Sequence, residues 1–167
     1  MPADTSRFPG FRPPPMNTGR DDGTGKALDI LAIIDERRNH VFVEQFLTAQ
    51  NISFKLVRND VDAVRAALWF QPKIIMMDME KPRRQGVRAI EFIRMFEQWS
   101  GQKRIPIVAL ADSCTEEELE RHRESGVDDF LTKPYTPQKM TSLLQSWIMF
   151  HELTEKTGKL RASAAAS

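Results

Sequence analysis

The chain has 167 residues, 41% of them hydrophobic, so it can bury one core of ordinary size, and a second domain is not expected. Lys and Arg number 24 against 23 Asp and Glu, a balance that shows neither a nucleic-acid-binding nor a membrane-binding surface. The chain has no apolar run of about 18 residues and no signal-peptide core. We therefore expect a cytoplasmic protein with no nucleic-acid or membrane partner.

The two ends of the chain differ in composition from its middle. Residues 1–26 hold five of the ten prolines and four of the eight glycines, with few large apolar side chains. Burial cannot offset the entropy of ordering such a segment, so we expect a disordered N-terminal tail. Residues 154–167 show no apolar periodicity, and we expect a second, flexible tail there. The predicted folded unit is 27–153.

The middle of the chain alternates between short apolar runs and helical patterns. In chain order, the runs fall at 28–34, 53–57, 74–77, 107–111 and 129–132. The first, third and fourth are almost continuously apolar, which is typical of strands buried on both faces of a parallel sheet. The second alternates and the fifth is short, so both are predicted nearer the edges of the sheet.

Apolar residues at helical spacing lie between and after these runs. Each set predicts a helix with one buried face: Val43 and Leu47; Val61, Val64 and Leu68; Ile90 and Ile93; and Met140, Leu143, Leu144, Trp147 and Ile148 after Pro137. The segment 116–125 differs, because only Leu119 is apolar there, although Thr115 and Glu118 predict a capping box at its start. We expect this helix to be the most loosely held and a candidate switch element.

A strict alternation of strands and helices predicts an α/β fold, with a parallel sheet and helices on both faces. Chemistry in such sheets lies at the carboxyl ends of the strands. There the first predicted strand ends in Asp35 and Glu36, the third in Asp78 and the fifth in Lys133. Mg²⁺ would relieve the repulsion between the carboxylates, and the lysine would supply a charge for a phosphoryl oxygen. For any one aspartate alone, the alternative is a helix cap.

Residues 28–150 resemble the receiver domains of bacterial, fungal and plant response regulators of two-component signalling. The matching segments are the strand ending in Asp35-Glu36, the run Asp78-Met-Glu-Lys-Pro82 with Gly86, residues 106–111 and Gly126-Val-Asp-Asp-Phe-Leu-Thr-Lys-Pro134. The last of these is the most specific. The resemblance implies a flavodoxin-like, five-stranded parallel sheet with strand order 2-1-3-4-5.

By this resemblance Asp78 is the phosphoacceptor, which takes a phosphoryl group from a histidine kinase or a histidine phosphotransfer protein. The resemblance implies Mg²⁺ as cofactor, held by Asp35, Glu36, Asp78 and the backbone carbonyl of Glu80. Lys133 matches the lysine that contacts the phosphoryl group, followed by a cis peptide bond to proline. Such a domain is not an enzyme in the ordinary sense, because it assists only its own phosphoryl transfer and dephosphorylation.

The chain departs from the family pattern at the switch. Phe130 occupies the place of the rotating switch aromatic, but Ala111 stands where the family usually has Thr or Ser. A lost hydrogen bond to a charged group is worth about 1.5–3 kcal/mol, comparable to a typical allosteric coupling of about 1–3 kcal/mol. Our hypothesis is that phosphorylation persists while the conformational response is weak or passes through another contact, such as Ser113.

Further departures leave alternatives open. Asp112 either adds negative charge that slows phosphorylation or simply faces solvent. A guanidinium of Arg37 or Arg38 either takes the place of the cation or is solvated in the first turn of a helix. A third reading, a hydrolase that forms an aspartyl phosphate, is disfavoured because Glu80 replaces the second Asp of such enzymes.

Two hypotheses about function follow. The first is a stand-alone receiver in a phosphorelay, which signals through its fourth and fifth helices to a downstream protein effector, because no output domain follows residue 153. The second is a pseudo-receiver that binds a partner without productive phosphorylation. Ala111, Asp112 and the neighbouring arginines favour the second, whereas the intact Asp78 and Lys133 oppose it.

Overall fold

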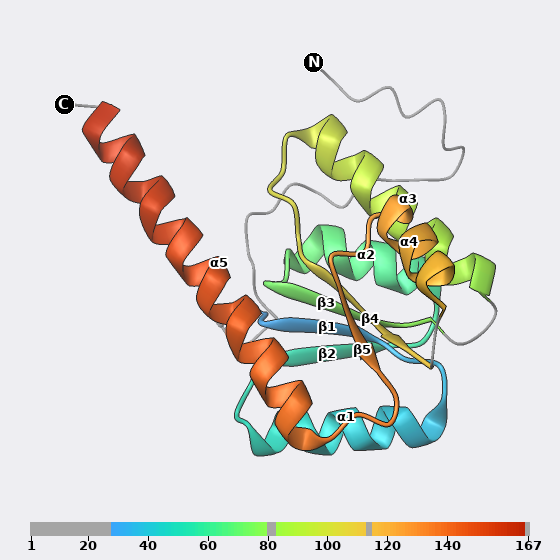
Figure 1. Cartoon of the computed structure of the whole chain (residues 1–167). Helices are drawn as coiled ribbons and strands as arrows, with labels where there is room; N and C mark the ends of the chain where they lie inside the picture. Colours follow the sequence, from blue (N-terminus) through green and yellow to red (C-terminus); the bar gives the residue numbers. More distant parts are fainter. Residues whose placement is uncertain (1–27, 80–82, 113–114, 166–167) are drawn as a thin grey trace.

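The computed structural model of the chain describes residues 28–79, 83–112 and 115–165. Five strands alternate with five helices along this part of the chain (Figure 1). Their bounds are β1 (Ile30–Ile33), α1 (Arg37–Ala49), β2 (Phe54–Val57), α2 (Asp60–Phe70), β3 (Ile74–Asp78), α3 (Arg83–Ser100), β4 (Ile107–Ala111), α4 (Glu116–Ser125), β5 (Asp129–Thr132) and α5 (Pro137–Ala165).

The five strands form one parallel sheet in the order β2-β1-β3-β4-β5. This confirms the predicted fold class and strand order, including the edge positions of β2 and β5. In the register of the central pair, Ile33 of β1 lies opposite Met77 of β3. The residues that follow β1 and β3 therefore leave the sheet side by side at its carboxyl end.

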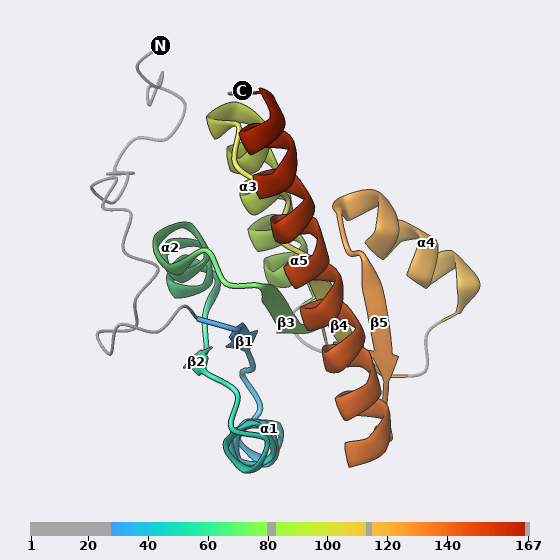
Figure 2. The same ribbon diagram turned by 90° about the vertical axis from the view of Figure 1, so that its left-hand side faces the viewer.

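Two apolar clusters lie on opposite faces of the sheet, because successive strand side chains point to opposite sides. In β1, Leu31 and Ile33 pack with α2 and α3, whereas Ile30 and Ala32 pack with α1 and α5. Figure 2 shows α1 and α2 on opposite sides of β1 and β2. Burial on both faces explains the continuous apolar sequence of the central strands.

The capping box predicted at the start of α4 is confirmed, and α4 has little to bury, as expected. None of its residues, all of which are described, is buried. Its start carries the capping box, in which Thr115 Oγ1 accepts from Glu118 N and Glu118 Oε2 accepts from Thr115 N. Gly126 ends the helix with φ of 113°, a left-handed conformation that favours glycine. α4 is therefore stabilised by its caps and surface ion pairs more than by burial.

The structure continues α5 as one helix to Ala165, into the segment from residue 154 where no regular element was predicted; the flexibility expected for this segment stays a prediction. The segment lacks an apolar stripe but holds four Ala and two Lys, residues of high helix propensity. Ion pairs from Lys73 to Glu152, at 3.8 Å, and from Lys103 to Glu155, at 3.4 Å, tie this helix to the loops before β3 and β4. Beyond them, α5 extends away from the sheet (Figure 1).

A buried ionic cluster connects α3 to the segment before β5. The guanidinium of Arg94 donates to Glu97 Oε2 at 2.8 Å, to Asp128 Oδ2 at 2.6 Å and to the carbonyl of Gly126 at 2.8 Å. Asp128 Oδ2 also accepts from the backbone N–H of Ile107 at 2.8 Å. Because Asp128 immediately precedes β5, the cluster fixes the start of both β4 and β5.

Residues 1–27 lie outside the described residues, so the N-terminal tail and the boundary at residue 27 stay predictions. Among the helices that the structure describes, none combines the length and the apolar composition needed to cross a membrane.

Candidate functional site

The candidate site lies where β3 and β5 end. Asp78 is the last residue of β3, and Lys133 follows the last residue of β5 directly. The backbone N–H of Lys133 donates to the carbonyl of Ala111 at 2.8 Å, so the β4–β5 ladder continues to the lysine. On the other side, Met79 N donates to the carbonyl of Leu110 at 3.0 Å. Both side chains are therefore anchored to β4 through their own backbone segments.

The structure brings the side chains of Asp78 and Lys133 together. Lys133 Nζ lies 3.6 Å from Asp78 Oδ2, and the two side chains are 17% and 5% exposed, respectively. The Lys133–Pro134 peptide bond is cis, as predicted. In this arrangement the carboxylate can attack a phosphorus atom, and the ammonium beside it can neutralise charge on the phosphoryl oxygens.

The acidic pair after β1 is exposed at the start of α1. Glu36 occupies the N-cap position of α1, but within the described residues its side chain makes no capping hydrogen bond. Instead, Glu36 Oε2 accepts a hydrogen bond from the side chain of Asn39 at 2.9 Å.

Asn39 is a site residue that sequence reasoning missed. Its Nδ2 also donates to Asp78 Oδ2 at 3.2 Å, so one amide contacts carboxylates at the ends of two different strands, β1 and β3. A signal was present, because Asn39 lies in the first turn of the helix after β1, and such turns face the site in doubly wound sheets.

The predicted cation site is only partly assembled by the described side chains. Among these residues, no three or more His, Cys, Asp or Glu form a group that could hold a metal ion. Glu36 and Asp78 are brought together through Asn39, and Asp35 is exposed after β1. Glu80, whose carbonyl is a predicted ligand, lies outside the described residues. Like charges repel, which explains why an amide donor stands between the two carboxylates.

The switch positions lie on two neighbouring strands, Ala111 at the end of β4 and Phe130 within β5. Ala111 is 2% exposed, so the position usually held by a hydroxyl residue is buried in the sheet. The Phe130 side chain is half-buried, with the Arg123 guanidinium 5.5 Å from its ring centroid and the His122 ring at 6.3 Å. Phe130 therefore contacts α4 directly. Asp112 is exposed, which fits both alternatives given for it, and Ser113 lies outside the described residues.

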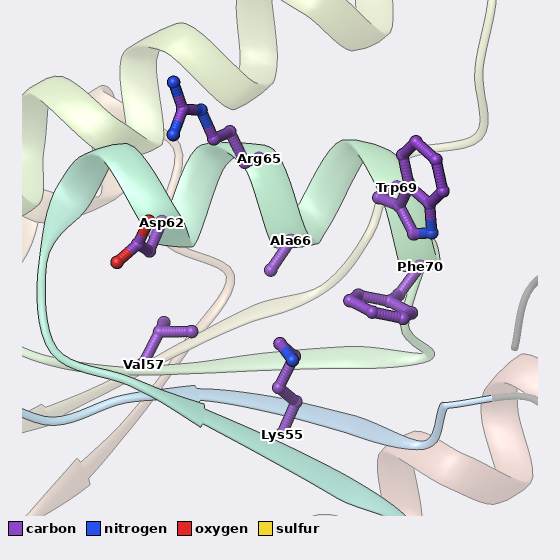
Figure 3. A pocket seen from close by; sticks show the side chains of 7 residues that line it. All are labelled: Lys55, Val57, Asp62, Arg65, Ala66, Trp69 and Phe70. Carbon is purple, nitrogen blue, oxygen red and sulfur yellow. The ribbon is translucent and has the colours of Figure 1, made fainter. Parts of the chain in front are cut away.

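A separate pocket of about 490 Å³ opens between β2 and α2 (Figure 3). It is lined by Lys55, Val57, Asp62, Arg65, Ala66, Trp69 and Phe70. Lys55 Nζ lies 5.0 Å from the centroid of the Phe70 ring, a cation–π contact across its mouth. None of the candidate site residues lines this pocket, so it is not where Asp78 would react.

The fold and the site together define a class of protein. A flavodoxin-like sheet carries an aspartate and a lysine at the carboxyl end of its strands, beside the acidic residues after β1. Residues 30–145 match the family model of the response regulator receiver domain. The chain therefore belongs to this family, the receiver domains of two-component systems.

Similar curated proteins include kinases and regulators. Sensor protein GacS of Pseudomonas syringae pv. syringae is 28% identical over 124 residues, covering 74% of this chain and 14% of that protein. Osmolarity two-component system protein SSK1 of Saccharomyces cerevisiae is 25% identical over 145 residues, covering 72% of this chain and 20% of that protein. The chain thus spans a fifth or less of the length of these two relatives.

Two solved structures of receiver domains are also similar to this chain. One is the co-crystal structure of the Saccharomyces cerevisiae histidine phosphotransfer signalling protein Ypd1 with the receiver domain of Ssk1, at a TM-score of 0.66 and 29% identity, covering 72% of this chain and 88% of that one. The other is the receiver domain of sensor histidine kinase PA1611 from Pseudomonas aeruginosa PAO1, with a magnesium ion coordinated in the active site cleft. It has a TM-score of 0.62 and 29% identity, and the match covers 72% of this chain and 97% of that one.

Proposed function

We propose that this receiver domain accepts a phosphoryl group on Asp78 in a Mg²⁺-dependent reaction. The observation that carries the proposal is the mostly buried contact between Asp78 Oδ2 and Lys133 Nζ, 3.6 Å apart at the end of β3. An oxygen of Asp78 would attack the phosphorus of a phosphohistidine, forming a P–O bond as the P–N bond breaks. Lys133 would stabilise the charge on the transferred oxygens.

The chemistry of the carboxylates at the site suits a magnesium ion. Carboxylate oxygens are ligands that Mg²⁺ prefers, and oxygens of Glu36 and Asp78 lie within hydrogen-bonding distance of a single amide nitrogen. Asp35, Glu36, Asp78 and the carbonyl of Glu80 are the proposed ligands. When bound, the ion would supply positive charge for the phosphoryl oxygens. The magnesium ion in the cleft of the PA1611 receiver domain supports this assignment.

The proposed partners are proteins. The complex of the Ssk1 receiver domain with Ypd1 supports a histidine phosphotransfer protein or a histidine kinase as phosphodonor. For output to a downstream effector, α5 offers Met149, Phe150 and Leu153, which are 60%, 55% and 57% exposed. Exposed apolar side chains gathered on one helix are typical of protein-binding surfaces. We place this signalling in the cytoplasm, and expect no enzymatic activity beyond phosphoryl transfer and its reversal.

The proposal is tested by measuring intact mass after incubation with acetyl phosphate, with and without Mg²⁺, for wild type and Asp78→Asn. We expect one phosphoryl adduct in the wild type that needs Mg²⁺ and is absent from the variant. The proposal would be contradicted if the wild type formed no adduct with either acetyl phosphate or a phosphorylated histidine phosphotransfer protein.

Ala111 favours a second candidate function, a pseudo-receiver that binds a partner independently of phosphorylation. A buried methyl group at this position cannot donate the hydrogen bond that would couple a phosphoryl group to Phe130. The two candidates differ in one measurable respect, because only the first predicts that partner affinity changes when Asp78 is phosphorylated.

A further inference from the structure

The side chain of Asn39 lies between two of the proposed magnesium ligands. Its Nδ2 is 2.9 Å from Glu36 Oε2 and 3.2 Å from Asp78 Oδ2. An amide nitrogen carries two hydrogens, so Asn39 can donate to both carboxylates at once. Asn39 itself is half-buried, in the first turn of α1. The amide therefore connects the end of β1 to the end of β3.

This contact is not the usual local cap of a helix. With Glu36 at the N-cap, Asn39 is the third residue of α1, where a side chain commonly reaches back to the backbone of the N-cap residue. Here Asn39 instead donates to the Glu36 carboxylate and continues to Asp78, 39 residues further along the chain. The amide thus contacts the residues of the site.

The same oxygen of Asp78 meets two donors from different elements. Asp78 Oδ2 lies 3.2 Å from Asn39 Nδ2 and 3.6 Å from Lys133 Nζ. Contacts from two sides fix the rotation of the carboxylate, and therefore the direction in which its other oxygen points. Such positioning matters for reaction rate, because a small displacement of the attacking oxygen is costly.

We propose that Asn39 is a positioning residue for magnesium binding and for phosphorylation of Asp78. It holds Glu36 and Asp78 in one arrangement through a single oxygen of each carboxylate. This role rests on the proposed function of the site. Hydrogen-bond partners of metal ligands typically contribute about 10–100-fold to metal affinity. Asn39→Ala is therefore expected to raise the dissociation constant for Mg²⁺ about tenfold.

The first test titrates Mg²⁺ into the full-length protein by calorimetry, without a phosphodonor, for wild type, Asn39→Ala and Gln45→Ala. Gln45 is an exposed amide on the same helix, so its variant controls for loss of an amide from α1. We expect weaker binding only in Asn39→Ala. Should that variant fail to fold, Asn39→Leu provides a near-isosteric side chain without a donor.

The second test separates positioning from general damage. Phosphorylation by acetyl phosphate should be slow in Asn39→Ala at low Mg²⁺ and should recover in part as Mg²⁺ is raised. In a protein that already carries Glu36→Gln, Asn39→Ala should reduce Mg²⁺ affinity by a smaller factor than it does in the wild type, since one of the two hydrogen bonds from Asn39 is already weakened. Equal Mg²⁺ dissociation constants in wild type and Asn39→Ala would overturn the role of Asn39 while leaving Asp78 phosphorylation standing. A wild type without any adduct would overturn the proposed function, and this role with it.

Discussion

Replacing Lys133 by Met should slow phosphorylation of Asp78 while keeping the length of the side chain. Lys133 Nζ lies 3.6 Å from Asp78 Oδ2. Two unit charges at this separation interact by about 4–5 kcal/mol at an effective dielectric constant of about 20. The lysine is 17% exposed and Mg²⁺ would share in neutralising the phosphoryl oxygens. We therefore expect Lys133 to stabilise the transition state by about 2–3 kcal/mol, less than the full interaction. That corresponds to a rate about 30–150-fold lower.

The assay measures the rate of adduct formation by intact mass at saturating Mg²⁺ and acetyl phosphate. Lys139→Met is the matched control, since Lys139 is exposed on the first turn of α5 and its variant makes the same change of charge. A Lys133→Met rate within about twofold of the control would refute the argument that the lysine stabilises the transferred phosphoryl group.

Three further predictions concern the switch, the core and pH. Ala111→Thr should enlarge the NMR chemical-shift changes that phosphorylation causes in α4. It should also lower the free energy of unfolding by about 1–3 kcal/mol, because the site is buried. Unchanged shifts would show that the lack of a hydroxyl at this position does not limit the coupling between Asp78 and α4. Arg94→Met should lower the free energy of unfolding in urea by about 3–5 kcal/mol, since it leaves Glu97 buried without its cation, although Asp128 keeps its ion pair with Arg104; a loss below about 1 kcal/mol would contradict this. Burial alone would raise the pKa of Asp29, but hydrogen bonds from Lys73 and Ser53 outweigh it and hold that pKa below its ordinary value. Ionised Asp29 therefore stabilises the fold above its ordinary pKa, and this contribution is lost as pH falls through the lowered pKa. The stability difference between wild type and Asp29→Asn in urea should thus be large at neutral pH and shrink in acid; a difference that does not change with pH would contradict it.

The sheet could be predicted because its strands are buried on both faces. Runs such as 74–77 and 107–111 are continuously apolar and of strand length, a pattern typical of central strands in a doubly wound fold. The far end of α5 could not be predicted in the same way. It is held by helix propensity and by ion pairs through Glu152 and Glu155, and neither produces an apolar stripe.

The candidate site was predictable where it coincides with strand ends. Asp78 and Lys133 follow apolar runs directly, so their meeting at one edge of a parallel sheet follows from topology. The bridge made by Asn39 depends on how the first turn of α1 is rotated over the sheet, which the sequence pattern does not specify. The convergence of Asp35 with the other carboxylates likewise depends on side-chain directions that no spacing rule determines.

The central claim is that Asp78 carries the phosphoryl group, and peptide mapping of the adduct tests it most directly. The wild type, incubated with Mg²⁺ and acetyl phosphate, would be digested and analysed by mass spectrometry, with and without hydroxylamine, which cleaves acyl phosphates. We predict one hydroxylamine-sensitive phosphoryl group on the peptide that contains Asp78. A phosphoryl group on any other peptide, or one that persists in Asp78→Asn, would contradict the account.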